Sequence, residues 1–403
     1  MKKHTAHLLC AAASSLLLSV PAAHAEKTFT ESLQAGSSVK LNFRTRYEDV
    51  SWDGLEDSDA FTLRSRLSYQ SGAWNGFGLT AEFDDVTEID NKVDYNNGNA
   101  INKTTAVIAD PEGTEVNQAF ISYTNFNNQI KYGRQRIILD NARFVGNVGW
   151  RQNEQTYDAV SISNKTIRYT NIFYAYLNNV NRVFGEQNTT KGATAGDHAQ
   201  DSHLLNVSYT GFSAGKLIGY SYLLDNKSAA ALSTNTYGVR WQGIVGTDFT
   251  YNLEYAKQSD AAKNPLSYDV DYILAEGALK VSKFTFTLGY ENLGSDNGIA
   301  GFATPLATLH AFQGWTDRFL ATPANGIKDV YFNVGTSIVG VNLLLSYHDL
   351  KSDVKSIDYG TEYDFQATKK FGPVVYTAKY STYSKDAFGS DTTKFWLMAD
   401  WSF

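Results

Sequence analysis

The sequence has 403 residues, a formal net charge of −7 at pH 7 and 14% aromatic residues. Nucleic-acid-binding domains normally carry a basic excess, so this acidic balance argues against a nucleic-acid partner. No apolar run approaches the roughly 18 residues of a membrane-spanning helix. The composition is therefore compatible with a secreted β-protein or with an outer-membrane β-barrel.

Residues 1–25 have the features of a secretory signal peptide. Two lysines are followed by a short apolar stretch and by an A-x-A cleavage site that ends at Ala25. We predict cleavage near Ala25, which leaves residues 26–403 as a single mature domain. Because Cys10 lies inside the signal peptide, the mature chain is predicted to have no disulfide and no thiolate nucleophile.

The first expected strand covers residues 38–49, SVKLNFRTRYED. Leu41 and Phe43 fall on one parity of this segment, while Arg44 and Arg46 fall on the other. Successive side chains of a strand point to opposite faces of a sheet. The alternation therefore predicts a strand with one apolar face and one charged face.

The same pattern recurs along the rest of the chain. FTLRSRLSY places Arg64 and Arg66 opposite its apolar residues, and FGLTAEFDD places Glu82 and Asp84 there. We count about 18 such segments of roughly ten residues, which is the length of a membrane-spanning β-strand. The last one, KFWLMADWSF, ends the chain on an apolar-face aromatic residue, Phe403.

Long and short connections alternate between these segments. Transmembrane barrels have tight periplasmic turns on one rim and long extracellular loops on the other, whereas a soluble sandwich has no reason to separate its loops in this way. The sequence therefore predicts an all-β fold, a transmembrane antiparallel β-barrel of about 18 strands of the outer-membrane porin type.

Charged side chains on these strands are expected to face the lumen. A charge facing lipid would cost about 2–4 kcal/mol near the midplane of the bilayer. Arg44, Arg46, Arg64 and Arg66 would then form a cationic strip on two adjacent strands, with Arg240 on a later strand. Guanidinium groups bind carboxylates bidentately, so an uncompensated strip would suit an anionic solute.

A different interpretation of the strip stays open. In it, Arg64 and Arg66 pair with Glu82 and Asp84 across the sheet. The two interpretations predict different effects of replacing all four arginines of the strip with glutamine. An uncompensated strip predicts altered ion selectivity in a folded barrel, whereas paired arginines predict reduced stability.

The tract from residue 130 to residue 160 does not fit a simple strand. Tyr132 shares a parity with Arg134 and Arg136, which would send two arginines into lipid, so we expect either a bulge at Gly133 or the end of the membrane span there. The loop that follows, 138–155, either enters the lumen as a constriction or stays at the surface.

The long connection 293–327 is unusually apolar and aromatic for a solvated loop. Its sequence predicts either that it packs against the barrel or that it lines the mouth.

Three stretches resemble the alginate export family of outer-membrane β-barrels. They are YGRQRIILDNARFVGNVGWRQNEQTYDAV (132–160), YAYLNNVNRVFG (174–185) and TPLATLHAFQGWTDRFL (304–320). The resemblance implies an 18-stranded barrel whose arginine-lined constriction passes an anionic uronate polysaccharide. Arg134, Arg143 and Arg151 match the first stretch and are implied as further pore residues.

The resulting hypothesis is an outer-membrane channel of a Gram-negative bacterium that passes anionic solutes, most of all uronate or alginate-type saccharides. The alternative is a general diffusion porin with weak selectivity. The candidate solute-binding residues are Arg44, Arg46, Arg64, Arg66, Arg134, Arg143, Arg151 and Arg240.

An enzymatic function is not expected, and neither is a cofactor or a metal ion. The four histidines of the mature chain have no neighbouring motif of a nucleophile element. The expected partners are an acidic saccharide or a small anion, the outer-membrane lipids and the barrel assembly machinery.

Overall fold

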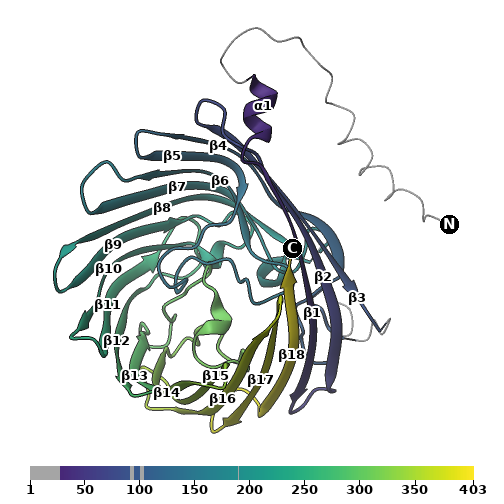
Figure 1. The fold of residues 1–403 in the computed structure, drawn as a ribbon. Coiled ribbons are helices and arrows are strands. Elements are labelled where there is room, and N and C mark those ends of the chain that lie inside the picture. Colours follow the sequence, from purple (N-terminus) through teal and green to yellow (C-terminus); the bar gives the residue numbers. More distant parts are fainter. Residues whose placement is uncertain (1–27, 91–94, 100–103, 189) are drawn as a thin grey trace.

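The structure, a computed structural model, describes residues 28–90, 95–99, 104–188 and 190–403. The predicted signal peptide lies outside these residues. Eighteen antiparallel strands form one sheet that closes on itself through the pairing of β1 (Ser38–Trp52) with β18 (Thr392–Ser402). Figure 1 shows the resulting barrel. The predicted fold class is confirmed.

Each strand pairs with its neighbours in the sequence, and almost no helix is present in the described residues. A single α-helix, α1 (Phe29–Gln34), precedes the barrel. The remaining strands are β2 (Ser58–Gln70), β3 (Phe77–Glu88), β4 (Gly113–Asn125), β5 (Asn128–Gln135), β6 (Thr156–Asn164), β7 (Thr170–Asn181), β8 (Asp197–Phe212), β9 (Gly215–Leu224), β10 (Thr234–Val245), β11 (Phe249–Asp260), β12 (Asp269–Val281), β13 (Phe284–Leu293), β14 (Ile327–Ile338), β15 (Val341–Lys351), β16 (Asp358–Phe371) and β17 (Val374–Lys385). Three short 3-10 helices lie in the loops, namely η1 (Gly192–Thr194), η2 (Ala230–Leu232) and η3 (Leu309–Ala311).

The alternation seen in the sequence becomes the two faces of the barrel wall. Apolar side chains such as Leu253 and Leu288 are exposed on the outer face, whereas Arg46 and Glu48 are buried on the inner face. In a bilayer, the backbone groups of a spanning segment must be satisfied internally, and a closed sheet does this without an edge. Among the described residues, no helix is long and apolar enough to cross a membrane.

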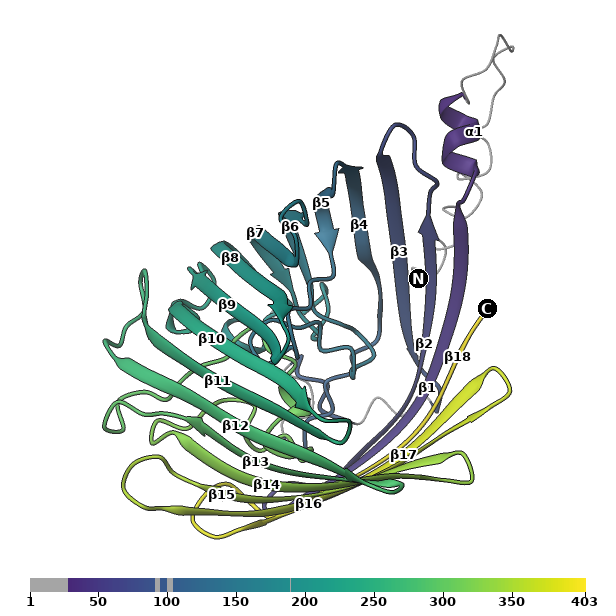
Figure 2. The same ribbon diagram turned by 60° about the vertical axis from the view of Figure 1, so that its left-hand side comes forward.

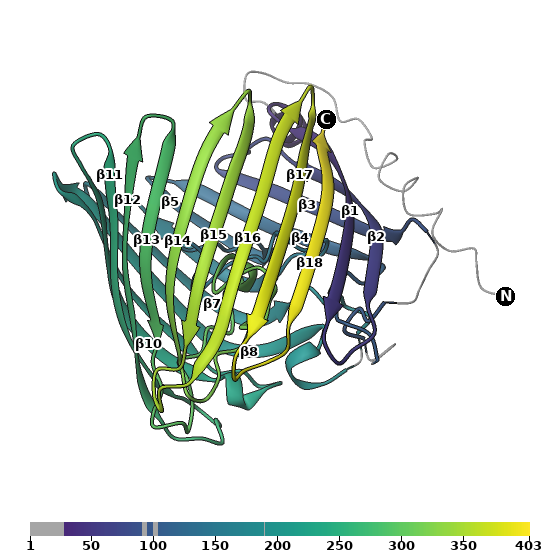
Figure 3. The same ribbon diagram turned by 90° about the horizontal axis from the view of Figure 1, so that it is seen from below.

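The two rims of the barrel differ in the length of their connections. One rim has tight turns, such as 126–127, 339–340 and 372–373, and the other carries the long connections, such as 136–155 and 294–326. Figure 3 shows the strands from the side, with the C-terminus at the rim of tight turns. We call these the short-turn rim and the long-loop rim. The alternation predicted from the sequence is confirmed.

The two ends of the described chain lie at the short-turn rim. Figure 2 shows α1 standing above this rim. The backbone N–H of Gly72, in the turn after β2, donates to the carbonyl of Leu33 in α1. At the other end, Phe403 is 70% exposed, its ring lies 6.4 Å from that of Phe43, and its N–H donates to Leu41 at 2.8 Å. The terminal aromatic residue faces outward, as predicted.

Candidate functional site

Both of the loops left open by the sequence fold into the barrel. Segments 136–155 and 294–326 lie inside the ring of strands in Figure 1. They are joined by a short parallel bridge between Val145 and Leu306, where the N–H of Gly146 donates to the carbonyl of Leu306 at 2.8 Å. We call the two segments together the loop plug.

Aromatic packing holds the loop plug against the barrel wall. The ring of Phe144 lies 5.3 Å from Tyr220, 5.2 Å from Tyr272 and 5.8 Å from Phe302, so it fills the space between β9, β12 and the second loop. Such ring contacts add about 0.5–1.5 kcal/mol each beyond the apolar area that they bury. The apolar residues of the two loops therefore form a core inside the lumen.

The backbone of the first loop is strained at three residues, which the surrounding structure must hold in place. Asp140, Ala142 and Val148 adopt left-handed conformations, with φ of 54°, 63° and 50°. Such residues cost of order 1 kcal/mol each and cluster at functional sites. Gly146 allows a close approach, because a Cβ atom there would lie 2.2 Å from the hydroxyl of Thr308.

Arg143 fixes the loop plug to β13. Its Nε donates to Glu291 at 2.6 Å and its guanidinium donates to Gln313 at 3.1 Å, while the charge lies 4.6 Å from the ring centre of Phe312. The side chain is almost fully buried. Burial alone would lower the pKa of Arg143, but the charge of Glu291 raises it, so the residue remains a cation.

Arg151 lies at the centre of a second buried network. It donates to Glu48 of β1 at 2.8 Å and to Asp317 of the other loop at 3.1 Å. Lys394 of β18 also reaches Asp317, at 2.7 Å, and Arg46 bonds to Glu48 at 2.7 Å. The network therefore ties both loops to the wall formed by β1 and β18.

Trp150 and His310 form an aromatic stack beside this network. Their ring centres are 4.7 Å apart with nearly parallel planes, and Arg46 and Lys379 lie over the face of Trp150 at 4.5 and 4.0 Å. The Nδ1–H of His310 donates to the carboxylate of Asp317 at 2.7 Å. Burial, followed by the charge of Lys379, lowers the pKa of His310 to about 3, so the ring is neutral at physiological pH.

The arginines of the predicted strip are paired. Arg44 donates to Asp400 at 2.8 Å, and Arg64 approaches the same carboxylate at 3.9 Å. Arg66 bonds to Asp84 at 2.5 Å and reaches Glu154 of the loop plug at 3.0 Å.

The expectation of an uncompensated strip is therefore wrong. The pairing expected as the alternative is present at Arg66, but most of the compensating carboxylates come from farther away. Asp400 lies on β18, whereas Asp110 and Glu154 lie in long connections. Burial alone would raise the pKa of Glu154, but the hydrogen bond from Arg136 and the charge of Arg66 lower it to about 2.

Arg134 keeps the strand register, so the predicted bulge at Gly133 is absent. It pairs with Ala119 on one side and Asp158 on the other without a shift. By parity it shares the outer face with Tyr132, which is 69% exposed. Its charge is met by Asp158 at 2.9 Å and by Glu186, at the point where β5 ends. The other expectation, that the span ends here, fits the structure, and a role for Arg134 in the lumen does not.

Arg240 is the last of the eight predicted arginines. It lies 3.8 Å from Glu254 and donates to Asn252 at 3.2 Å. It lines a hollow of about 180 Å³ between the second loop and β10 to β15. Each of the eight arginines thus has a carboxylate within 4.0 Å.

A larger hollow of about 640 Å³ opens on the side of the loop plug that faces the long-loop rim. We call it the outer vestibule. Its charged lining consists of Arg151, Arg182, Lys191 and Lys394 against one carboxylate, Asp317. Burial lowers the pKa of Arg182 to about 10, which leaves it cationic at neutral pH. The rest of the wall is partly apolar, with Trp52, Phe184, Leu309 and Leu320 among its residues.

Several residues of this site were not singled out from the sequence. Arg182 and Lys191 lie in the connection 182–196, and Asp317 lies in the second loop. The only sequence signal for these residues was their position in long connections, which are expected at the mouth of a barrel. The alternation of inward and outward side chains applies only within strands. Of the eight predicted arginines, only Arg151 is among the described residues that line the vestibule.

The sequence matches the family described as alginate export over residues 35–271. A search among curated proteins found no match.

Solved outer-membrane barrels resemble the structure over nearly its whole length. OccK3 (OpdO) of Pseudomonas aeruginosa matches with a TM-score of 0.71 and 12% identity, over 93% of this chain and 97% of its own. OccAB4 of Acinetobacter baumannii matches with a TM-score of 0.71 and 15% identity, over 92% and 98%. OpdK of P. aeruginosa, solved with vanillate, matches with a TM-score of 0.70 and 13% identity, over 92% and 99%. At these identities the likeness concerns the fold.

Proposed function

The chain belongs to the alginate export family of outer-membrane β-barrels, and from this premise we propose that it is a porin-type channel for anionic solutes, with acidic saccharides of the uronate class as its main cargo. The observation that carries the proposal is the charge of the outer vestibule. Four cationic side chains face a single carboxylate there, and that carboxylate, Asp317, already accepts from Arg151 and Lys394. Of these cations, Lys191 is exposed and has no carboxylate within 4.0 Å among the described residues, so its charge would attract an anion that enters from the long-loop rim.

The size of the vestibule favours a small solute. A volume of about 640 Å³ lies within the range of pockets that enclose small ligands. Trp52 and Phe184 supply amphipathic aromatic faces of the kind that can lie against a ring. A monosaccharide or a short oligosaccharide with a carboxylate therefore fits the vestibule better than a polymer does.

The relation to OpdK is consistent with a carboxylate cargo. That protein was solved with vanillate, an aromatic carboxylate. The shared feature that we carry over is the carboxylate, and the saccharide part of the proposal rests on the family.

A general diffusion porin is the second candidate. It is favoured by the pairing of all eight predicted arginines, which leaves the wall beside β1 and β2 close to neutral. In such a channel, the vestibule would raise the local anion concentration without selecting one anion.

Reversal potentials in a planar bilayer test the proposal. The wild-type channel is expected to be anion-selective in a KCl gradient and to be blocked by trigalacturonate. Replacement of the exposed vestibule cation, in Lys191→Gln, should shift the reversal potential toward cations and weaken the block several-fold. Lys263→Gln is the matched control, because this exposed lysine lies in the connection 261–268 and does not line the vestibule. A wild-type channel without anion preference and without block would refute the proposal.

A further inference from the structure

A second hollow lies on the opposite side of the loop plug, toward the short-turn rim. It has a volume of about 350 Å³ and is bounded by β5 to β9 and by residues 136–140 of the first loop. We call it the inner hollow. It is separate from the outer vestibule, with which it shares no lining residue.

The wall of the inner hollow is rich in hydroxyl and amide groups. The register of the sheet places Asn171 opposite Ser208 and Ser163 opposite the aromatic Phe173, so the polar residues Ser163, Asn171 and Ser208 come from three adjacent strands, β6, β7 and β8. Ser163 donates to Asn171 at 3.0 Å, which leaves the amide nitrogen of Asn171 as a donor. A polar wall of this kind offers both donors and acceptors to a polyhydroxylated ligand.

Two lysines project into the same hollow. Lys131 comes from β5 and Lys216 from β9. Within the described part of the chain, neither has a carboxylate within 4.0 Å, in contrast with the eight paired arginines. The amino group of Lys131 lies 4.9 Å from the ring centre of Phe120. Both lysines are therefore positive charges without a described counter-ion.

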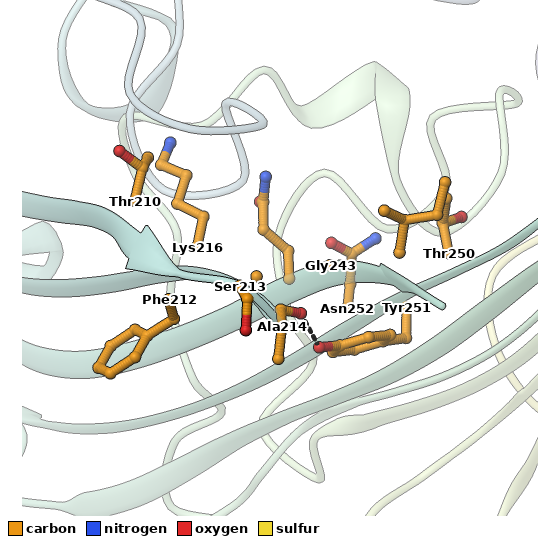
Figure 4. A pocket seen from close by; sticks show the side chains of 12 residues that line it. Thr210, Phe212, Ser213, Ala214, Lys216, Gly243, Thr250, Tyr251 and Asn252 are labelled. Atoms are coloured by element: carbon orange, nitrogen blue, oxygen red, sulfur yellow. Dashed lines mark hydrogen bonds between the residues drawn. The ribbon is translucent and has the colours of Figure 1, made fainter. Parts of the chain in front are cut away.

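Lys216 also lines a third hollow, of about 410 Å³, at the short-turn rim between β8 and β11. In Figure 4, Lys216 and Thr210 project to one side of the sheet, while Tyr251 lies on the other side and donates to Ala214 at 2.6 Å. The lysine thus stands where the inner hollow meets the rim. A solute that moves between the loop plug and that rim would pass it.

The acidic side chain of the inner hollow does not cancel this charge. Asp140 is the lining carboxylate, and it accepts from the amide of Asn206 at 2.8 Å. Arg136 also lines the hollow and is paired with Glu82 of β3 and Glu154 of the first loop, neither of which lines the hollow. The two lysines and Asp140 leave a net positive charge.

We propose that the inner hollow is a second solute site, in which Lys131 and Lys216 bind the carboxylate of a sugar acid and the Ser and Asn side chains of β6 to β8 bind its hydroxyls. This site deepens the proposed function and depends on it. An ammonium group binds a carboxylate as a compact point charge, and hydroxyl and amide groups match ring hydroxyls. An aromatic acid of similar size has fewer hydroxyls to satisfy these groups, so the inner hollow selects sugar acids over aromatic acids.

Single-channel recording with side-specific addition tests the inner site. The orientation of each inserted channel is identified with Lys263→Cys, which places a thiol on the long-loop rim. A membrane-impermeant maleimide added to one chamber reacts with this thiol only when the long-loop rim faces that chamber. Trigalacturonate and benzoate are then added from the short-turn side. We expect trigalacturonate to block at a concentration at least tenfold lower than benzoate.

Two variants separate the charge from the hydroxyl contacts. Lys131→Gln/Lys216→Gln should weaken the block by trigalacturonate from the short-turn side at least fivefold, and leave the block from the long-loop side unchanged. Ser163→Ala/Ser208→Ala should weaken the block by trigalacturonate and leave that by benzoate unchanged. If the double lysine variant does not fold, Lys216→Gln alone replaces it as the test of the charge.

The outcomes separate the two proposals. An anion-selective wild-type channel whose block from the short-turn side is the same in all these variants refutes the inner site and leaves the proposed function standing. A wild-type channel that lacks anion selectivity, and that trigalacturonate blocks from neither side, refutes the proposed function itself.

Discussion

Two parts of the barrel wall carry positive charge in opposite ways. The wall of β1, β2 and β18 holds several arginines, and each has a carboxylate of the wall, of β3 or of a long connection within 4.0 Å. The wall of β5 to β9 has fewer cations, but Lys131 and Lys216 have no described carboxylate within 4.0 Å. The comparison teaches that the density of charge on a lumen wall does not measure the charge available to a solute. The arginine wall positions the loop plug, whereas the two lysines of the other wall line the inner hollow.

Removal of the arginine wall should have the largest effect. In the variant Arg44→Gln/Arg46→Gln/Arg64→Gln/Arg66→Gln, the carboxylates of Glu48 and Asp84 lose buried partners. Breaking one buried pair costs about 3–5 kcal/mol, so we expect the free energy of unfolding to fall by at least about 3 kcal/mol. Urea unfolding of the refolded barrel measures this.

The same variant should be blocked by trigalacturonate as strongly as the wild type, wherever it still forms channels. Weaker block at unchanged stability would overturn the comparison and restore the view of the arginines as a solute-binding strip.

Acidification should have the next largest effect, through His310 of the loop plug that the arginine wall positions. His310 has a pKa of about 3 in the folded protein, because of burial and the charge of Lys379, against about 6.5 in an unfolded chain. The unfolded state therefore binds the proton first, and stability is lost as the pH falls from about 6.5 toward 3. Between pH 7 and pH 5 we expect a loss of about 2 kcal/mol from this residue.

Unfolding curves at both pH values, for the wild type and for His310→Gln, isolate this contribution. The variant should show a smaller difference between pH 7 and pH 5. Equal differences in the two proteins would mean that His310 does not carry the acid sensitivity. The charge of Asp317 adds a further loss at lower pH, because the surrounding cations hold its pKa well below the usual value despite its burial.

Asp400 offers a milder test of the pairing. Its carboxylate accepts from Arg44 at 2.8 Å and from Asn42 at 2.8 Å, but its side chain is 31% exposed. Solvent screening reduces the strength of such a pair. We expect Asp400→Asn to lower the free energy of unfolding by about 1 kcal/mol. Loss of more than twice this amount would place Asp400 among the buried network rather than at its edge.

The lysine wall should respond least in stability. Lys216 is half-buried and has no described ion pair, so Lys216→Gln is expected to change the free energy of unfolding by no more than about 0.5 kcal/mol. The same unfolding assay, with Lys263→Gln as the matched exposed control, measures this change. A large loss for Lys216→Gln would show that the two walls are built alike.

The sequence by itself determined the barrel. Its period-2 alternation, the alternating lengths of its connections and the terminal Phe403 depend on local geometry and on lipid contact, and each is visible without knowing which residues meet in space. The same local signal correctly placed Arg46 and Arg64 on the lumen face.

The tertiary structure decided what the lumen charges do. Arg64 meets Asp400 only because β1 and β18 close the barrel, and Arg151 meets Glu48 only because its loop turns inward. These partners are separated by more than 100 residues, and no periodicity in the sequence encodes such a distance. The position of Lys131, beside a hollow and without a described carboxylate within 4.0 Å, is equally a product of barrel closure. The burial and the ion pairs of a lumen side chain depend on all the strands that surround it.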